Sequence, residues 1–275
     1  MKGQKGEQGN LVPRRSQRLS ALMQTTMLSS LPPELLDLVV HHLRDEPTTL
    51  KACCLISRLW FYLTQRHLFA CVEFHAQKSH IKRWKKAFPD PSTSPAHYTR
   101  SLSIGGIPFI PVPDTSAGGW IHTFHNLVHL HLEYHGWEDD QVSLVPFHGL
   151  SPTLKSLHLT SAFSEVLDLI CSFPLLEDLA LISLSPGSDS WSTPSTSPKL
   201  TGSLALRTFQ GFRPVARRLL DLPDGLHFAK IMAECYTEDA ESTMGLVSRC
   251  SDTLESLSVY CETLGPLPSV PTSGR

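Results

Sequence analysis

A short leucine phrase returns along most of this chain at nearly regular intervals. Four copies follow the pattern Leu-x-x-Leu-x-Leu, the last with Val in third place, and they start at Leu127, Leu154, Leu176 and Leu254. Weaker copies start at Thr99, Leu206 and Phe228. In each strong copy the last two apolar residues alternate with polar ones, which is typical of a strand with one buried face. The phrase therefore predicts a series of short strands, each needing a second layer over its apolar side.

Segments that suit a helix lie beside some of these predicted strands. Residues 164–174 offer Ser164 as an N-cap, several aliphatic residues and a terminating Pro174, and residues 242–250 also have helical spacing. A period of roughly 20 to 29 residues resembles that of leucine-rich repeats, with parallel strands inside and helices outside. We therefore predict an α/β fold with an irregular leucine-rich-repeat-like solenoid. Chance periodicity in an unrelated α/β domain stays the alternative, because three of the phrases are degenerate. The repeat family's Asn or Cys is also missing, so the repeat is irregular.

Nearer the start, the segment LPPELLDLVVHHLRDEPTTLKACCLISRLW, residues 31–60, is unusually apolar. Its prolines favour a helix start, so we predict a helix over 33–43, a break at RDEPTT and further helix capped by Thr49. Two apolar stripes run along the first helix, whereas an amphipathic surface helix needs one. They comprise Leu35, Val39 and His42, and Leu36, Val40 and Leu43. A unit this small cannot bury both stripes, so we expect one to meet another surface.

The same segment resembles an F-box, whose pattern opens with Leu-Pro-x-Glu and two aliphatic residues and closes with aliphatic-Ser-x-x-Trp. The first half matches at Leu31, Pro32, Glu34, Leu35, Leu36, Val39, Val40 and Leu43. The second half matches at Leu50, Leu55, Ile56, Ser57 and Trp60. Val40 stands where an aromatic residue is common, and the connection at RDEPTT is slightly longer than usual. The resemblance covers about one seventh of the chain.

The resemblance implies a partner, a Skp-type adaptor that links F-box proteins to a cullin scaffold and a RING subunit. It places this contact on Leu31, Pro32, Leu35, Leu36, Val39, Leu43, Ile56 and Trp60. The chain would then be the substrate-recognition subunit of an SCF-type ubiquitin ligase, acting in the cytoplasm, the nucleus or both. A repeat scaffold without any ligase is the alternative, and a metal-dependent hydrolase built on the histidines between 125 and 158 is a further one.

In a solenoid of this kind, the polar residues flanking the buried leucines line the concave face. We predict that a target protein binds there, on His129, His131, Glu133, Ser156, His158, Thr160, Asp178, Ser256, Ser258 and Tyr260. His131 and His158 would be lateral neighbours on adjacent strands, about 4.8 Å apart.

Motifs that would indicate catalysis are missing from the sequence. It contains no GxSxG elbow, no GxxxxGK phosphate loop, no HExxH pair and no dinucleotide-binding glycine fingerprint. The histidines around 125–135 do not complete a tetrahedral metal site, so no metal or cofactor is expected. A net charge of -2 argues against nucleic acid as a partner, and the chain has no apolar run that predicts a membrane span. Its seven cysteines, without a CxxC pair, fit reduced thiols.

These patterns divide the chain into five predicted regions. They are a disordered basic tail at 1–29, an F-box-like helical domain at 30–70, a linker and helix at 71–97, the repeat region at 98–262 and a flexible tail at 263–275. Two stretches rich in Pro and Ser, 89–95 and 185–199, are predicted to be exposed loops. Ser94, Thr193 and Ser197 each precede a proline, so a proline-directed kinase is one interpretation, and a plain flexible loop is the other.

Overall fold

The computed structural model divides the chain into two compact units, Met1–Leu68 and Phe69–Arg275. The structure describes residues 31–75, 78–106, 118–133, 144–160, 166–182, 198–207, 212–222 and 225–262. The two predicted tails, 1–29 and 263–275, lie outside these residues.

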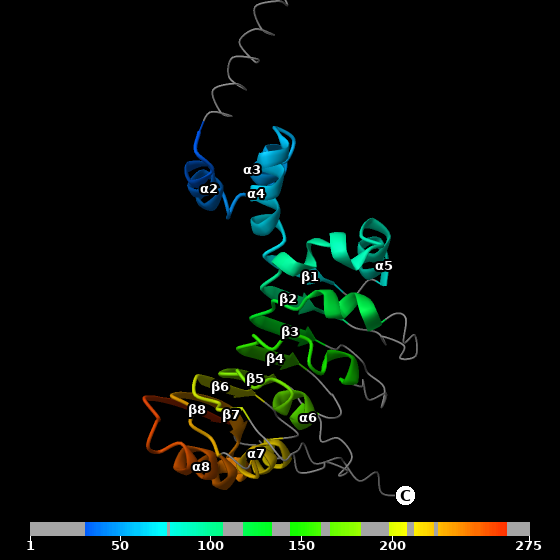
Figure 1. The fold of residues 1–275 in the computed structure, drawn as a ribbon. Helices are drawn as coiled ribbons and strands as arrows, with labels where there is room; N and C mark the ends of the chain where they lie inside the picture. The colour runs from blue at the N-terminus through cyan, green and yellow to red at the C-terminus, as the bar shows by residue number, and fades with distance from the viewer. Residues whose placement is uncertain are drawn as a thin grey trace, which may run out of the picture. The chain divides into compact units, whose positions relative to one another are not determined.

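In the described part of the first unit, residues 31–68, the helices are α2 (Pro33–His42), α3 (Pro47–Cys53) and α4 (Arg58–Leu68) (Figure 1). Helix α2 begins at Pro33, as its prolines predict, and ends one residue before the predicted boundary. The prediction that Thr49 caps the next helix is wrong. Helix α3 already begins at Pro47, since proline suits a first turn, and the Thr49 hydroxyl instead donates to the Glu46 carboxylate at 2.9 Å.

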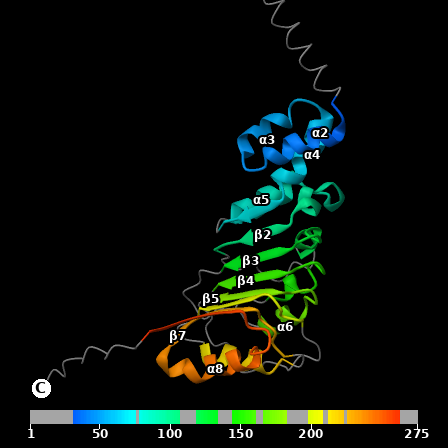
Figure 2. The ribbon, with the colours of Figure 1, turned by 90° about the vertical axis from the view of Figure 1, so that its left-hand side faces the viewer.

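The second unit contains one parallel sheet whose eight strands follow one another in chain order (Figures 1 and 2). Each neighbouring pair is parallel. The strands are β1 (Cys71–Phe74), β2 (Ser101–Ile104), β3 (His129–Glu133), β4 (Ser156–Thr160), β5 (Asp178–Ile182), β6 (Ser203–Arg207), β7 (Lys230–Tyr236) and β8 (Ser256–Glu262). The predicted α/β class is therefore confirmed.

Helices and short 3-10 turns connect these strands. The α-helices are α5 (Lys78–Ala87), α6 (Val166–Cys171), α7 (Phe212–Leu220) and α8 (Ala240–Arg249). The 3-10 turns are η1 (Pro91–Thr93), η2 (Pro95–Tyr98), η3 (Gly118–Thr123), η4 (Val145–Phe147) and η5 (Thr237–Asp239). Helices α6 and α8 fall where the sequence predicts helices, while Ser164, the predicted N-cap, lies outside the described residues.

Alternate residues of each strand build one continuous core. In β3 and β4, Leu130 pairs with Leu157 and Leu132 with Leu159, and all four are buried. The same leucine row continues into β5. Burying one such side chain is worth roughly 1.5 to 3 kcal/mol, so the stacked leucines supply much of the force that holds the sheet together. The residues between them point to the opposite face, because successive side chains of a strand alternate.

Backbone hydrogen bonds repeat with the leucine phrase. The carbonyl of Arg100 accepts from the N–H groups of Val128 and His129, and the carbonyl of Val128 accepts from those of Lys155 and Ser156. Side chains add a second link, since the Thr153 hydroxyl donates to the Leu127 carbonyl at 3.0 Å. The Thr253 hydroxyl donates to the Phe228 carbonyl at 3.3 Å in the same relative position. Each copy of the phrase is thus bonded to the copy before it.

Two parts of the sheet differ from the sequence prediction. The sheet begins at β1, ahead of the repeat region expected from residue 98, and Phe74 of β1 packs edge-on against Trp84 and Trp120. The phrase predicted to start at Leu206 is also wrong in register. Its strand is β6, in which Leu204 pairs with Leu179 and Leu206 with Leu181.

A glycine explains the shifted register at β6. A Cβ atom on Gly202 would lie 2.4 Å from Asp178 Oδ1 and 3.0 Å from the Glu177 carbonyl oxygen. Asp178 Oδ1 instead accepts from both the backbone N–H and the hydroxyl of Ser203, each at 2.7 Å. The chain has three residues between Leu200 and Leu204, one more than the phrase has between its first two leucines, so the six-residue pattern does not find the strand.

The loop predicted to be exposed at 89–95 is exposed from Pro89 to Thr93, but Ser94 and Pro95 are buried. It folds into the 3-10 turn η1 and leads into η2, and Ser94 is buried at its end. The Ser94 hydroxyl accepts from the Ala96 N–H at 3.3 Å and so caps η2. A kinase could not reach this hydroxyl without unfolding the turn. Thr193 and Ser197 lie outside the described residues.

Candidate functional site

The first candidate surface belongs to the helical unit. Its core consists of Leu36, Val40, Leu50, Cys53 and Trp60. These side chains come from all three helices, so they hold the unit together. The Thr64 hydroxyl donates to the Trp60 carbonyl at 2.7 Å and lies 2.9 Å from Cys54 Sγ, which joins α4 to the end of α3. An ion pair between Arg66 and Asp37 joins α4 to α2.

The two apolar stripes of α2 differ in burial. Leu36 and Val40 are fully buried in the unit's core, whereas Leu35 is 47% exposed and Val39 is 42% exposed. Leu38, next to Val39, is also exposed. Residues three and four apart share a helix face, so Leu35, Leu38 and Val39 form one outward apolar stripe. The unit therefore leaves apolar surface on α2 that its own core does not use.

The residues predicted to bind a Skp-type adaptor fall into two groups. Leu31, Pro32, Leu35, Val39 and Ile56 are exposed, and Leu43 is half-buried. Leu36 and Trp60 are buried inside the unit, so their side chains support the surface from below. A helical pattern marks apolar positions without distinguishing core from surface, and the adaptor contact itself stays a prediction.

Sequence reasoning did not assign several other exposed apolar residues to this surface. They are Leu38, Leu55, Leu59, Phe61 and Tyr62. Leu55 is the most exposed of them at 88%, although the sequence alone suggests a core position within the second helical segment. It lies in the turn between α3 and α4, where the chain leaves the helical path, and this explains the difference.

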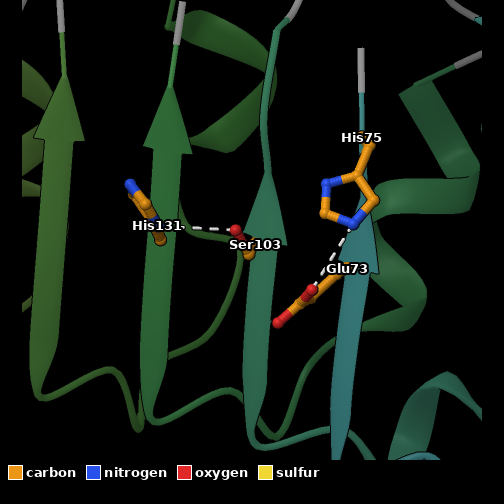
Figure 3. A network of polar contacts seen from close by, with 4 residues as sticks. All are labelled: Glu73, His75, Ser103 and His131. Atoms are coloured by element: carbon orange, nitrogen blue, oxygen red, sulfur yellow. Dashed lines mark hydrogen bonds and ion pairs between the residues drawn. The ribbon is translucent and has the colours of Figure 1, made fainter. Parts of the chain in front are cut away.

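The second candidate surface is the sheet face opposite the leucine core. His131 and His158 are register partners there, and their rings stack with centroids 4.1 Å apart and planes 19° apart. This confirms the prediction that they are lateral neighbours. The Ser103 hydroxyl lies 3.4 Å from His131 Nδ1 (Figure 3), and the Thr160 hydroxyl lies 3.4 Å from His158 Nε2.

The electrostatics of this face oppose protonation of His158. Burial lowers the pKa of the His158 ring, the neighbouring His131 lowers it further, and the Glu133 carboxylate acts in the opposite direction. Just after the end of β1, His75 Nε2 lies 3.6 Å from a carboxylate oxygen of Glu73 (Figure 3). The first four strands therefore present a face of imidazoles, hydroxyls and carboxylates.

The rest of the predicted target-binding residues lie on β3, β4, β5 and β8. His129, Ser256, Ser258 and Tyr260 are exposed, and Glu133, Ser156, Thr160 and Asp178 are half-buried. The pairing register brings the members on β3, β4 and β5 together, and those on β8 lie three strands away. Asp178 is already bonded to Ser203, so its carboxylate mainly shapes the chain path before β6.

Strands β6 and β7 add residues to this face that sequence reasoning missed. Arg207 and Glu234 form an ion pair across these strands at 2.5 Å, and Lys230 and Met232 are exposed on β7. Arg207 was missed because the phrase at Leu206 was placed in the wrong register. The FAKIMA phrase at Phe228 was found, and its alternation could have identified the β7 residues.

Among the residues that the structure describes, no group of three or more His, Cys, Asp and Glu side chains is placed to hold a metal ion. His135 of the histidine-rich segment lies outside these residues. Within the same described part of the chain, no helix is long and apolar enough to span a lipid bilayer. Comparison with protein-family models found no match, and a search of curated proteins likewise found none.

Proposed function

We propose that this protein is a substrate-recognition subunit of an SCF-type ubiquitin ligase. In this proposal the helical unit is an F-box that docks a Skp-type adaptor, and the sheet belongs to an irregular leucine-rich-repeat solenoid that binds a target protein. The observation that carries the proposal is the outward stripe of Leu35, Leu38 and Val39 on α2. It lies in the segment whose residues match the F-box pattern.

Two features of the helical unit support a docking role for this stripe. The unit already has a core of its own, so the exposed residues are not needed to close it. Full burial of a Leu or Val is worth roughly 1.5 to 3 kcal/mol, and a half-exposed residue can recover about half of that on binding. Six exposed residues, Leu31, Leu35, Leu38, Val39, Ile56 and Leu59, could then contribute several kcal/mol before association costs.

The repeated geometry of the sheet supports the second half of the proposal. Strands in chain order, a continuous leucine row and hydrogen bonds that recur with the phrase are the expected features of stacked repeats. The face around His131 and His158 would then meet the target. The protein would act by proximity, because it holds the target's lysines near the ubiquitin-conjugating enzyme and does no chemistry itself. Its place of action would be the cytoplasm, the nucleus or both.

Co-purification of the full chain with a Skp-type adaptor tests this function. The double variant Leu35→Asp, Val39→Asp should abolish binding, because it puts two carboxylates into the proposed interface. Both side chains are exposed, so the variant should keep the thermal unfolding of the wild type. Lys51→Asp on α3 is the matched control, since it changes the net charge by the same amount at an exposed polar position.

Adaptor binding that survives the double variant would overturn the proposed interface. An intact chain that binds no Skp-type adaptor would favour the alternative, a repeat scaffold without any ligase.

A further inference from the structure

Two cysteines face each other at the last strand of the sheet. Cys235 on β7 and Cys261 on β8 are register partners, and their sulfur atoms lie 3.7 Å apart. Both are free thiols, and they differ in access: Cys235 is buried and Cys261 is exposed. The pair thus joins an accessible sulfur to a protected one across neighbouring strands.

We propose that Cys235 and Cys261 form a reversible disulfide in response to oxidised low-molecular-weight thiols. Neighbouring strands lie about 4.8 Å apart, within the range of roughly 4.4 to 6.8 Å between Cα atoms that a disulfide spans. The two sulfurs already point toward each other, so closure needs side-chain rotation and only small backbone movement. The exposed edge of β8 leaves the bond open to reducing thiols.

The exposure and the pKa of the two thiols decide which of them reacts first with the oxidant. Cys261 meets the oxidant first because its thiol is exposed. Burial raises the pKa of the Cys235 thiol, and nearby Cys261 and Asp239 raise it further, whereas a hydrogen bond with Thr243 opposes them. Cys235 is therefore a poor first nucleophile, and it acts as the resolving thiol within the folded protein.

The reaction with oxidised glutathione proceeds in two exchanges. The Cys261 thiolate attacks one sulfur of glutathione disulfide, which forms a mixed disulfide on Cys261 and releases one glutathione thiolate. Cys235 then loses its proton and attacks the Cys261 sulfur, which forms the protein disulfide and releases the second glutathione. The two cysteines are oxidised, and one glutathione disulfide is reduced to two glutathiones.

The disulfide would fasten the least covered strand of the sheet. Strand β8 comes last in the strand order, and its residues Leu257 and Val259 are 47% and 42% exposed, although they continue the leucine row. A cross-link to β7 would hold this strand against local opening. Ser258 and Tyr260 lie on the same strand, so a redox effect on target binding would follow, and only this last step rests on the proposed function.

Mass spectrometry of the intact chain treated with glutathione disulfide tests the proposal. In the wild type we expect a Cys235–Cys261 cross-linked peptide and a loss of two hydrogen atoms per chain. In Cys235→Ala and Cys235→Ser, glutathione should remain on Cys261, with a lifetime at least about tenfold longer than in the wild type. Amide exchange in β8 should slow by one to two orders of magnitude on oxidation, the scale expected for closing a loop of this length.

Cys71→Ser is the matched control, because Cys71 is also exposed on an edge strand but faces Ser101. It should form the same disulfide as the wild type. A mixed disulfide on Cys261 that lasts equally long with and without Cys235 would overturn the proposal, as would a Cys261 that does not react. Neither outcome bears on adaptor binding, so this test and that of the proposed function fail separately.

Discussion

In the sheet unit, Leu157 and its counterparts on the neighbouring strands are buried under helices and turns, and the polar residues between them face outward. In the helical unit, α2 buries one apolar stripe and exposes the other. Among the described residues, nine large exposed apolar side chains lie in the short helical unit and seven in the much longer sheet unit. A sheet of eight strands with helices and turns over it closes its own core, whereas the short described helices of the first unit leave apolar surface exposed.

The largest effect is expected inside the helical unit, where neighbouring aromatic residues differ in burial. Trp60 is 5% exposed and Phe61 is 42% exposed. Trp60→Ala should lower the free energy of unfolding by about 3 to 5 kcal/mol, because it empties the centre of a small core. Phe61→Ala should change it by less than about 0.5 kcal/mol. Denaturant unfolding of both variants measures this, and similar losses would mean that Phe61 also belongs to the core.

A buried and an exposed residue can also be compared in the sheet unit, at two equivalent positions of the leucine phrase. Leu157 in β4 is fully buried, and Leu257 in β8 is half-exposed. Leu157→Ala should cost about 2 to 5 kcal/mol, and Leu257→Ala should cost a small fraction of that. Amide exchange and thermal unfolding read out both variants. An equally large loss at Leu257 would show that β8 is covered in solution.

A smaller effect is expected at Gly202, where the regular phrase breaks. Gly202→Ala places a Cβ against Asp178 and the Glu177 carbonyl, so it should destabilise the protein by about 1 to 3 kcal/mol. Thr201→Ala, at an exposed neighbouring position, should stay within about 0.5 kcal/mol of the wild type. If Gly202→Ala leaves the thermal unfolding midpoint unchanged, the close approach does not determine the register of β6.

The smallest effects are expected when the pH is lowered, and the free energy of unfolding should then fall in both units. Burial and the nearby Arg66, His41 and Arg44 lower the pKa of His67 in the helical unit, and burial and His131 lower that of His158. Each folded histidine binds its proton less tightly than the unfolded chain does. The contribution of each neutral histidine to the free energy of unfolding is therefore fully present above the ordinary pKa of 6.5, and it is lost as the pH falls below that value.

His67→Gln and His158→Gln should each make stability less dependent on pH between about 5 and 7, where histidine changes charge. Unfolding measured across this range, variant against wild type, checks both. A steeper dependence in either variant would contradict the assigned direction for that histidine.

Several parts of this architecture could be predicted from the sequence, because they depend on local periodicity. Alternating apolar residues indicated the strands β2, β3, β4, β5, β7 and β8, and the paired prolines indicated the start of α2. The lateral pairing of His131 with His158 followed from equal positions in successive phrases. Strand β1 was missed, although residues 69–74, FACVEF, alternate in the same way as the FAKIMA phrase. Its apolar positions hold Phe69, Val72 and Phe74, so a search for leucines passes over it.

The sequence alone determined which positions are apolar and with what period, since side-chain direction follows from the geometry of a helix or strand. Only the tertiary structure decided which of those positions are covered. Leu36 and Leu35 have equal chemistry and adjacent numbers, yet packing against Trp60 and its neighbours buries one and leaves the other outside. Equal positions in the phrases that start at Phe228 and Leu254 already place Cys235 beside Cys261, but only the structure shows that one thiol is buried and the other exposed, with their sulfur atoms 3.7 Å apart.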